Sequence, residues 1–481
     1  MVKCLEEEGV TRIFGYPGVA ISPFYEALYN AGTIEHVLVR QEQAAGHAAS
    51  GYARISRKAA VCVTSSGPGA TNLITALATA YADSIPLIAI TGQVNSNLLG
   101  RDVFQEADMR GSTESFVKYS YLVKSADDIP RIFKEAFYIA STGRKGPVLI
   151  DIPCDVQIDL LKKSFDYTSE VNIRGYKPST KGNNPQMHKV VAAINKAKKP
   201  LICAGGGVIL GNGEECVRQF CEKNNIPLVT TMMGIGVMPK NHPLYFGMLG
   251  NNGKPYANRA VANSDLLIIA GARIADRAVP KPENLEQQVN IIHIDIDTAE
   301  IGKNLGPTIP LVGDIKSIFD RLLQENISID TSNWIETLQD IKKSTVDHRV
   351  FSDKLVNPML LVQHLSEKMD DDAIYVADVG QNQLWSADNY VMKNGRFLTS
   401  GGMGTMGYSI PAGIGAKMCT PDKQVVVVCG DGSFQMTSEE LAAAFLDHAP
   451  VKIAILNNSV YGMVRQWQTL FYEHHYSQTN L

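Results

Sequence analysis

The sequence predicts an α/β protein made of three doubly wound parallel-sheet domains, the third of them truncated. Its 481 residues are too many for a single hydrophobic core, which favours two to four domains. Runs of β-branched residues alternate with helix-like segments along the chain, a pattern typical of strands buried on both faces of a parallel sheet. One strand–helix–strand unit near the end also carries polar residues directly after each strand, where such sheets bind ligands.

The composition is that of an ordinary globular protein, with 45% hydrophobic and 20% charged residues. The formal net charge is −4 and no basic block occurs, so we expect no nucleic acid as a partner. No apolar run approaches the roughly 20 residues that cross a bilayer, so we expect no membrane association. The eight cysteines form no C-x-x-C pair, which favours a reducing, cytoplasmic location over a disulfide framework.

The first predicted domain covers residues 1–165. Its expected strands are residues 12–14, 36–39, 60–64, 87–91 and 148–152, with helices between them. A polar stretch rich in Lys, Ser and Gly follows at residues 176–184 and is typical of a linker.

The second and third predicted domains cover residues 186–335 and 355–481. Strands are expected at residues 200–204, 227–230, 266–270 and 290–296, and then at 373–377, 424–429 and 451–456. A charged helix over residues 334–348 lies between the two domains. Because the sequence stops soon after one further helix, we expect the third sheet to be short of strands.

The most informative unit begins with Gly430-Asp431-Gly432 and ends with Asn457-Asn458. Each motif directly follows one of the last two predicted strands, and a right-handed crossover makes those strands parallel neighbours. Asp431 and Asn458 should therefore emerge together at the carboxyl edge of the sheet. A carboxylate and an amide oxygen side by side suit Mg²⁺, which shares its octahedral oxygen coordination with phosphates.

The segment between these motifs predicts a helix that starts at Ser438, with the serine as its cap and acids in its first turn. Its N-terminal amides would favour an anion near the same sheet edge. A Gly-Asp-Gly alone is usually only a turn. The double asparagine at this spacing, with each motif on a hydrophobic strand end, favours a ligand site instead.

Further motifs are distributed along nearly the whole chain. They are FGYPG at residues 14–18, QEQ at 41–43, TSSGPGATN at 64–72, FQE at 104–106, GAR at 271–273, SGGMGTMG at 400–407 and GMVRQW at 462–467. Together they resemble the acetohydroxyacid (acetolactate) synthase catalytic subunit among the thiamine diphosphate-dependent enzymes. The resemblance implies a pyrimidine-binding, a central FAD-type and a diphosphate-binding domain. It also implies that Asp431, Asn458 and Val460 hold the Mg²⁺ that anchors thiamine diphosphate.

By itself, Glu42 is an acid that complements the dipole of an Ala-rich helix. The resemblance implies that it is instead the carboxylate that hydrogen-bonds the aminopyrimidine ring of the cofactor. In this family that acid reaches a cofactor bound mainly by the partner subunit, so a homodimer or tetramer with active sites at the interface is implied. Phe104 and Gln105 join Glu42 in the catalytic set that the resemblance implies.

The resemblance also implies a set of cofactor-binding residues. Met406 matches the bulky residue that bends the cofactor, and the glycines around it permit close approach; an ordinary core methionine is the alternative. The full set is Pro17, Gly380, Gln381, Gly404, Met406, Gly430, Gly432, Ser433 and Met463.

Four residues are implied at the substrate. Arg277 matches the arginine that pairs with the acceptor carboxylate, a task suited to a guanidinium; a surface cation is the alternative. Trp467 resembles the feature that favours 2-ketobutyrate as acceptor. Val19 and Cys154 complete the substrate set.

The central domain of these synthases holds an FAD that does no redox work. The residues that would hold it here are Gly205, Gly206, Gly207, Arg273, Asp295 and Asp314. A glycine triplet after a strand is typical of any tight turn from strand to helix. It also lacks the Gly-x-Gly-x-x-Gly spacing of a dinucleotide site.

The sequence departs from the family at several positions. Val19 stands where the family has glycine, Cys154 where it has lysine, Arg101 where it has a small hydroxyl residue, and Asn251-Asn252 where it has Met-His. As judged from the family, these positions surround the acceptor channel and the flavin rather than the thiamine. Cys154 has no visible histidine partner, so we expect it to be inert.

The resemblance implies decarboxylation of pyruvate and its ligation to a second 2-keto acid, with thiamine diphosphate and Mg²⁺. The product would be 2-acetolactate or 2-aceto-2-hydroxybutyrate, in branched-chain amino acid biosynthesis, and a small regulatory subunit would be a partner. Two alternatives stay open. One is a related thiamine diphosphate enzyme with another acceptor or donor, and the other is a truncated paralogue without catalysis.

Overall fold

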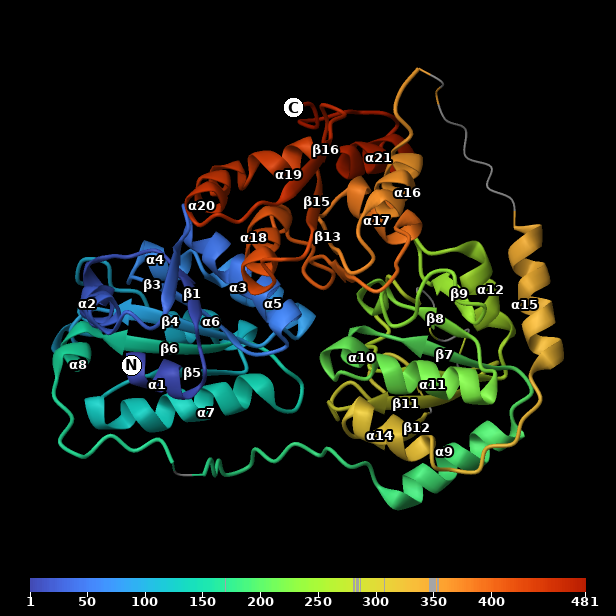
Figure 1. Ribbon diagram of the computed structural model, residues 1–481, viewed down its shortest axis with the longest axis horizontal. Coiled ribbons are helices and arrows are strands. Elements are labelled where there is room, and N and C mark those ends of the chain that lie inside the picture. Colours follow the sequence, from blue (N-terminus) through green and yellow to red (C-terminus); the bar gives the residue numbers. More distant parts are fainter. Residues whose placement is uncertain are drawn as a thin grey trace. The chain divides into compact units, whose positions relative to one another are not determined.

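The structure, a computed structural model, describes residues 1–168, 170–279, 282, 285, 287–306, 308–345, 352 and 354–481. These residues form three parallel sheets flanked by helices (Figure 1). The predicted fold class is thereby confirmed. Among the described helices, none combines the length and the apolar character that a bilayer crossing requires.

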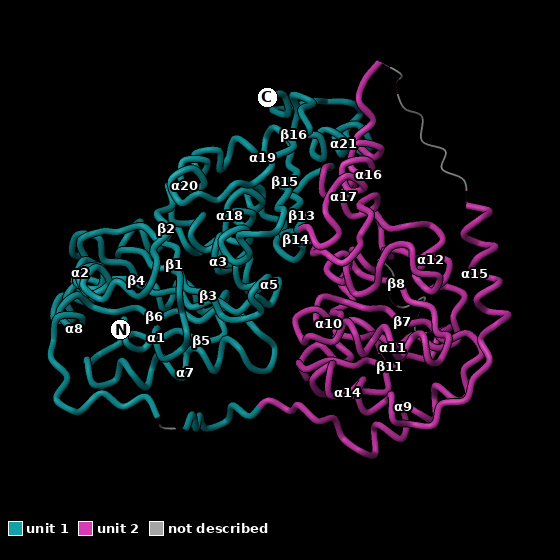
Figure 2. Tube along the Cα trace, viewed as in Figure 1, with its two compact units in different colours: residues 1–177, 374–381, 398–481 teal, residues 178–373, 382–397 magenta. Residues whose placement is uncertain are grey.

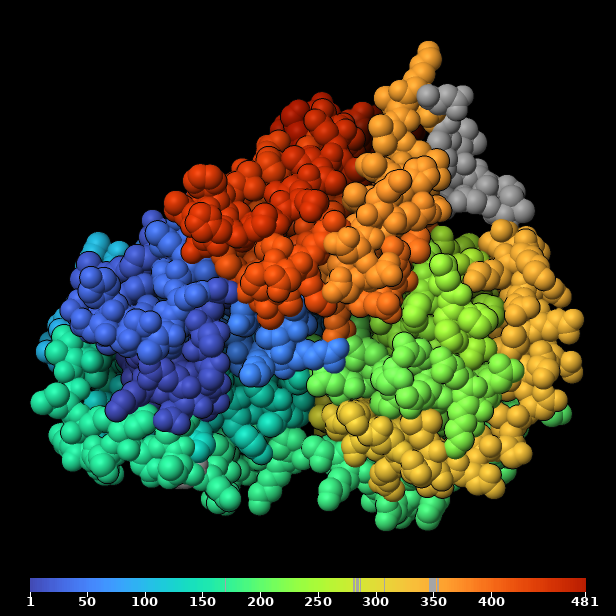
Figure 3. Space-filling view, viewed as in Figure 1, coloured from blue at the N-terminus to red at the C-terminus, as the bar shows by residue number. Residues whose placement is uncertain are grey.

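The chain divides into two compact units (Figure 2). Unit 1 consists of residues 1–177, 374–381 and 398–481, and unit 2 of residues 178–373 and 382–397. The segments at the two ends of the sequence therefore fold together in unit 1. In Figure 3 the blue N-terminal and red C-terminal segments of this unit lie against each other.

The first sheet has six strands in the order β2-β1-β3-β4-β6-β5. They are β1 Arg12–Gly15, β2 Glu35–Leu38, β3 Ala60–Thr64, β4 Leu87–Gln93, β5 Tyr119–Leu122 and β6 Val148–Pro153. Its helices are α1 Val2–Glu7, α2 Ser22–Ala31, α3 Glu42–Ser56, α4 Pro68–Thr71, α5 Ile74–Asp83, α6 Met109–Thr113, α7 Ile129–Ser141 and α8 Cys154–Ile158. Short 3-10 turns are η1 Val19–Ile21, η2 Ser96–Leu98, η3 Glu114–Phe116 and η4 Ala126–Asp128. The sequence did not predict β5, because this edge strand is only partly buried and lacks an apolar run.

The second sheet, in unit 2, has the order β12-β11-β10-β7-β8-β9. Its strands are β7 Pro200–Ala204, β8 Leu228–Thr230, β9 Tyr245–Met248, β10 Leu266–Ala270, β11 Asn290–Asp295 and β12 Ile309–Val312. The helices of this part of the chain are α9 Asn184–Lys196, α10 Gly206–Leu210, α11 Glu214–Asn224, α12 Pro255–Asn263, α14 Ile315–Leu322, α15 Ser332–Ser344 and α16 Pro358–Lys368, with η5 Met232–Gly234. The helix predicted over residues 334–348 corresponds to α15, and residues 346–348 lie outside the described residues.

The third sheet has the order β14-β13-β15-β16. Its strands are β13 Ile374–Ala377, β14 Arg396–Leu398, β15 Val425–Gly430 and β16 Lys452–Leu456. The helices of this part are α17 Gln381–Asn389, α18 Ser409–Cys419, α19 Asp431–Gln435, α20 Leu441–Leu446 and α21 Gly462–Phe471, with η6 Ser438–Glu440.

Two glycines allow α3 and α18 to cross at very short range inside unit 1. A Cβ atom added to Gly51 would overlap the carbonyl oxygen of Ala412, and one added to Gly415 would overlap that of Ala48. Residues 409–418 of α18 are all buried. The crossing therefore joins the helix that begins with Glu42 to the helix that follows the glycine-rich loop.

The helix start predicted at Ser438 is wrong in detail. Ser438 lies inside the 3-10 turn η6, Thr437 occupies the N-cap position, and no side chain caps the turn. The hydroxyl of Thr437 donates instead to the carbonyl of Gly407 at 3.0 Å. The helix that begins at the strand end is α19, which starts at Asp431 itself.

Gly415→Ala should destabilise the fold by about 1–3 kcal/mol, because the new methyl group meets a fixed backbone carbonyl. The loss is expected although alanine is the better helix former by about 1 kcal/mol. The urea midpoint measured by circular dichroism reports it. Gly306→Ala is the matched control, since an added Cβ there has nothing within 4 Å. Equal urea midpoints for Gly415→Ala and Gly306→Ala would contradict the close contact between α3 and α18.

Candidate active site

The ends of β15 and β16 bring the two predicted signature motifs into contact. The two strands are parallel neighbours, and Gly430 pairs with Leu456 at their carboxyl ends. Asp431 follows directly, and its Oδ2 accepts a hydrogen bond from the backbone N–H of Ser459 at 2.7 Å. The predicted adjacency of the two motifs is confirmed.

The asparagine loop presents oxygen atoms at this edge. The side-chain oxygen of Asn457 accepts from the N–H of Ser459 at 3.0 Å, and that of Asn458 accepts from the N–H of Val460 at 3.2 Å. Both asparagines are exposed, and Asp431 is partly exposed. No group of three or more His, Cys, Asp or Glu side chains gathers at a metal-sized site within the described residues. A cation here would therefore depend on one carboxylate supplemented by amide and carbonyl oxygens, which suits Mg²⁺.

The end of β13 joins the same edge, since β13 is the other neighbour of β15. Gly380 follows β13 with φ of +134°, a conformation that favours glycine. The amide of Gln381 donates to the side chain of Gln466 at 3.0 Å. A Cβ added to Gly462 would overlap the Gln381 side chain and lie 3.0 Å from Nδ2 of Asn458. Three strand ends and the start of α21 thus meet closely.

The residues next to Asp431 are tightly packed. A Cβ added to Gly432 would lie 2.7 Å from the ring of Tyr461. Ser433 is buried, and its hydroxyl donates to the carbonyl of Gly430 at 3.1 Å. Met463 lies partly buried in the first turn of α21. Gly432 and Ser433 therefore lie directly at the end of β15, and Met463 follows Gly462, which lies close to Asn458 and Gln381.

Asp378 fixes the glycine-rich loop to the end of β13. Its buried carboxylate accepts from the N–H groups of Val379 at 2.8 Å, Gly407 at 3.0 Å and Ser409 at 2.9 Å. Burial raises the pKa of Asp378, and these hydrogen bonds oppose the rise. Asp378 was not predicted from the sequence, although an acid directly after a buried strand is the same signal that singled out Asp431.

A second buried acid holds the other end of that loop. Asp83, at the end of α5, accepts from the N–H groups of Gly401 at 3.3 Å and Gly402 at 2.7 Å. It also accepts from Arg54 of α3 at 2.6 Å. The loop that carries Met406 is therefore anchored at both ends, and Met406 itself is partly buried.

Glu42 opens α3, and its surroundings come from the TSSGPGATN motif. Its Oε2 accepts from the side-chain amide of Asn72 at 2.9 Å. A Cβ added to Gly69 would lie 3.3 Å from Oε1. Gln105 has φ of +59° and lies against Gly67, whose added Cβ would be 2.9 Å from it. Two predicted catalytic residues, Glu42 and Gln105, thus contact the same glycine-rich motif.

Family comparisons agree with this geometry. The sequence model of the thiamine pyrophosphate enzyme N-terminal TPP binding domain matches residues 1–112, that of the central domain residues 187–322, and that of the C-terminal TPP binding domain residues 378–481. The chain is 45% identical to the acetolactate synthase large subunit of Corynebacterium glutamicum, over 100% of this chain and 78% of that protein. It is 44% identical to the acetolactate synthase large subunit of Lactococcus lactis, over 100% of this chain and 83% of that protein.

The chain belongs to the acetolactate synthase family of thiamine pyrophosphate enzymes. The agreement extends to an archaeal relative, since the probable acetolactate synthase large subunit of Methanocaldococcus jannaschii is 45% identical over 100% of this chain and 83% of that protein. The resemblance predicted from the motifs is confirmed.

Of the predicted substrate residues, Val19 and Trp467 are exposed in unit 1, as is the predicted catalytic residue Phe104, while Cys154 in the same unit is partly buried. Val19 is 85% exposed in the turn after β1, and Phe104 is 87% exposed. Trp467 is 49% exposed on α21 and contacts the ring of Phe471. Cys154 starts α8 and is partly buried, and burial raises the pKa of its thiol. A raised pKa agrees with an inert cysteine.

The loop after β1 lies against the same motif as Glu42. Pro17 is exposed in this loop. A Cβ added to the following Gly18 would overlap the side chain of Ser65. In unit 2, Arg277 is exposed and forms an ion pair with Asp276 at 3.6 Å.

The glycines predicted to meet a flavin are explained first by packing within unit 2. The N–H of Gly205 donates to Ala270, and that of Gly207 to Gly271, both at 2.9 Å. A Cβ added to Gly205 would overlap Gly271, and one added to Gly206 would lie 3.0 Å from Met233. The turns after β7 and β10 pack so closely that the glycine triplet has little room for side chains.

The other predicted flavin residues have local structural partners. Asp314 caps α14 by accepting from the N–H of Ser317 at 2.9 Å. Asp295 ends β11 and accepts from the N–H of Asp297 at 2.9 Å. The carbonyl of Arg273 accepts from Asn304. Among the described residues, no hydrogen bond or ion pair to the Arg273 guanidinium is found, and a guanidinium is a group that can bind a phosphate.

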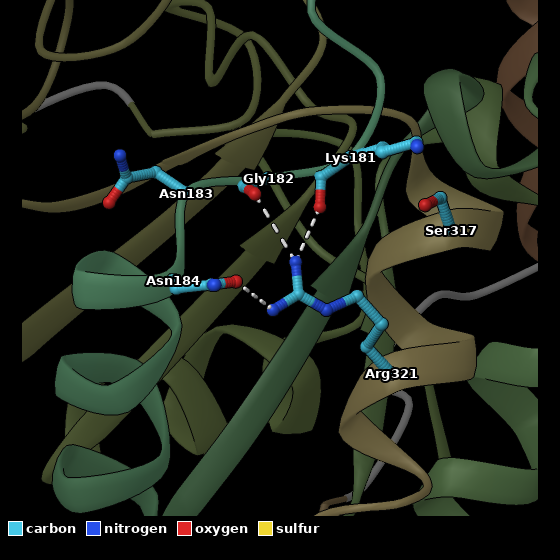
Figure 4. Close-up of a pocket in the computed structure, with 6 residues that line it drawn as sticks. All are labelled: Lys181, Gly182, Asn183, Asn184, Ser317 and Arg321. Atoms are coloured by element: carbon cyan, nitrogen blue, oxygen red, sulfur yellow. Dashed lines mark hydrogen bonds between the residues drawn. The ribbon is translucent and has the colours of Figure 1, made fainter.

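A pocket of about 680 Å³ lies elsewhere in unit 2, between the chain before α9 and the helix α14 (Figure 4). The guanidinium of Arg321 donates to the carbonyls of Lys181 and Gly182 and to the side chain of Asn184. Its hydrogen bonds therefore tie the start of α9 to α14. None of the predicted site residues lines this pocket.

Asp378→Asn should weaken thiamine diphosphate binding, because an amide keeps one acceptor oxygen where the carboxylate uses two. Leaving a buried N–H unpaired costs about 1–3 kcal/mol, which corresponds to a rise in Kd of about 5- to 150-fold. Titration calorimetry with thiamine diphosphate measures it. Asp422→Asn is the control, since Asp422 is exposed. An unchanged Kd for Asp378→Asn would show that the loop does not need this anchor.

Proposed function

We propose that this protein decarboxylates pyruvate and ligates the product to a second 2-keto acid, with thiamine diphosphate and Mg²⁺. Pyruvate as acceptor would give 2-acetolactate, and 2-ketobutyrate would give 2-aceto-2-hydroxybutyrate, both in branched-chain amino acid biosynthesis. The observation that carries the proposal is the contact between Asp431 and the asparagine loop at two neighbouring strand ends. It occurs in a chain that is 45% identical to acetolactate synthase large subunits.

The proposed metal ligands are the carboxylate of Asp431, the amide oxygen of Asn458 and the carbonyl of Val460. They supply only oxygen atoms at an edge that is open to solvent, which fits a hard cation bound together with a diphosphate. The groups proposed to hold the diphosphate and the thiazolium side are Gly380, Gln381, Gly430, Gly432, Ser433 and Met463. When bound, the cofactor supplies a cationic ring that accepts the charge left by decarboxylation.

The proposed role of Glu42 is to hydrogen-bond the aminopyrimidine ring. Its hydrogen bond from Asn72 orients the carboxylate, and Gln105 would approach the substrate from the turn at Gly67. Phe104 would close the chamber as an apolar wall. Met406 and Gly404 would hold the cofactor ring from the anchored loop, and Pro17 from the loop after β1.

The acceptor is proposed to meet Arg277, Trp467, Val19 and Cys154. Arg277 has a planar guanidinium suited to a 2-keto carboxylate, and its one described ion pair is exposed. Val19 and Cys154 differ from the usual family residues, which favours one second candidate: a related thiamine diphosphate enzyme that uses another acceptor.

We also propose the domain roles and partners that the family implies. Residues 1–165 would bind the pyrimidine, 186–335 a nucleotide, and 355–481 the diphosphate. Active sites would form between chains in a homodimer or tetramer. The relatives are named large subunits, which supports a small regulatory subunit as a partner.

An assay with pyruvate, thiamine diphosphate and Mg²⁺ tests the reaction. We expect release of CO₂ and formation of acetolactate, and formation of 2-aceto-2-hydroxybutyrate when 2-ketobutyrate is added. Absence of both products would remove the proposal. Release of CO₂ without either carboligation product would favour the second candidate.

Asp431→Ala should raise the Kd for thiamine diphosphate in the presence of Mg²⁺ by at least about 10- to 100-fold, the range lost when even an indirect metal partner is removed. Calorimetry at several Mg²⁺ concentrations measures it. Asp422→Ala, at an exposed position in the same part of the chain, is the control. Equal, Mg²⁺-dependent binding in both variants would place the metal elsewhere.

FAD is proposed to bind through Gly205, Gly206, Gly207, Arg273, Asp295 and Asp314. The close turns after β7 and β10 explain the glycines without a ligand. The proposal therefore depends on the family and on the Arg273 guanidinium, which has no hydrogen bond to a described residue. We expect the purified protein to show flavin absorption that chromatography does not remove, and Arg273→Ala to lose it. A colourless protein that stays colourless after incubation with FAD would contradict this.

A further inference from the structure

Glu440 is a buried acid that reaches from the third-sheet segment to the start of α3, within unit 1. Its side chain lies in the turn η6, and the residue is only 1% exposed. One oxygen, Oε1, accepts from the backbone N–H groups of Arg40 at 2.8 Å and Gln41 at 3.0 Å. These two amides immediately precede Glu42, the first residue of α3.

The start of α3 cannot supply this acceptor itself. Gln41 stands at the N-cap with an extended backbone and makes no side-chain cap. In a capping box, an acid at the third helical position returns to the N-cap N–H, but that position is Ala44 here. Glu440 therefore performs the task from a segment far away in the sequence.

The charges around Glu440 come from few groups. Burial raises the pKa of Glu440 to about 7, with Glu439 adding to the rise and the hydrogen bonds and charge of Arg40 opposing it. Helix α18 also packs on this turn, and its one charged residue, Lys417, donates to the carbonyl of Lys423. Asp447 interacts with Arg40 from beyond α20. No described ion pair neutralises Glu440.

We propose that Glu440 is a positioning residue for Glu42, which it orients by fixing the two preceding backbone amides. The proposal rests on the proposed function, because only a thiamine-dependent reaction gives Glu42 its task. Glu440 itself touches neither cofactor nor substrate in this scheme. Glu440 acts by fixing the start of α3. A small displacement of this helix start would lengthen the proposed hydrogen bond between Glu42 and the aminopyrimidine ring.

The ionised carboxylate is the stronger acceptor for the two amides. As the pH falls through about 7, protonation of Glu440 weakens the hydrogen bonds that it accepts from the N–H groups of Arg40 and Gln41. Glutamine at this position keeps an acceptor oxygen but stays neutral at every pH. The wild type at low pH and Glu440→Gln should therefore behave alike.

Stability has the opposite pH dependence. A carboxyl group whose pKa is raised on folding favours the folded state at low pH, and this contribution is lost as the pH rises through about 7. Glu440→Gln cannot ionise, so at about pH 8 its urea midpoint should equal or exceed that of the wild type. A loss of kcat without a loss of stability would separate positioning from structural damage.

The first experiment is hydrogen exchange of the full chain without cofactor, on wild type, Glu440→Ala, Glu440→Gln and the neighbouring exposed control Glu439→Gln. The amides of Arg40 and Gln41 should exchange about tenfold faster in Glu440→Ala than in the control at the same pH. Exchange no faster than in the control would overturn the proposal. This readout does not require an active enzyme.

The second experiment measures acetolactate formation. Glu440→Ala should lower kcat by about 10- to 100-fold with the KM for pyruvate within about twofold, because Glu42 does not bind pyruvate. The ratio of wild-type to Glu440→Gln kcat should be several-fold at about pH 8 and approach one at about pH 6. A kcat of Glu440→Ala equal to that of Glu439→Gln, or a ratio independent of pH, would overturn the proposal. An inactive wild type would instead contradict the proposed function. The exchange experiment would still show whether Glu440 fixes the amides of Arg40 and Gln41.

Discussion

The close crossing of α3 and α18 is the constraint on which the arrangement of unit 1 depends. Gly51 and Gly415 lack the Cβ atoms that would overlap the carbonyls of Ala412 and Ala48. Because α18 is buried along nearly its whole length, neither helix can shift without exposing apolar surface to water. The start of α3, with Glu42, and the loop before α18, with Met406, are therefore placed by one rigid contact.

Buried carboxylates then fix the loops that leave these helices. Asp378 and Asp83 hold the two ends of the glycine-rich loop, and Glu440 holds the turn before Glu42, each by accepting backbone N–H groups. Loops rich in glycine have much conformational entropy to lose, and a charged acceptor restricts them with stronger hydrogen bonds than a neutral one. Asp83 also forms an ion pair with Arg54. Burial raises the pKa of Asp378 and of Glu440.

Sequence periodicity predicted the buried strands well and the edge strands poorly. Strand β15 is a run of β-branched residues, and such a run indicates a strand buried on both faces. Strand β5 lies at a sheet edge, is only partly buried and shows no apolar run. The contact of Asp431 with the asparagine loop followed from strand order and crossover handedness alone. The role of Glu440 could not be predicted, because it depends on a contact across 400 positions of sequence. Its local pattern instead suggested a first-turn acid on a helix capped by Ser438.

Val19 and Cys154, two positions at which we expect this sequence to depart from the family, take no part in the hydrogen bonds described above for Asp378, Asp83 and Glu440. Val19 is exposed in the turn after β1, and Cys154 begins α8 after β6, while the anchored groups follow β2, β13 and β15 or precede α18. A change at Val19 or Cys154 alters the surface that a substrate would meet without disturbing a buried hydrogen bond of Asp378, Asp83 or Glu440. If the proposed substrate residues are right, the choice of acceptor and the retention of the cofactor would depend on different parts of this chain. A fold can keep its buried anchors while its exposed loops change, because a change in a loop leaves the buried hydrogen bonds in place.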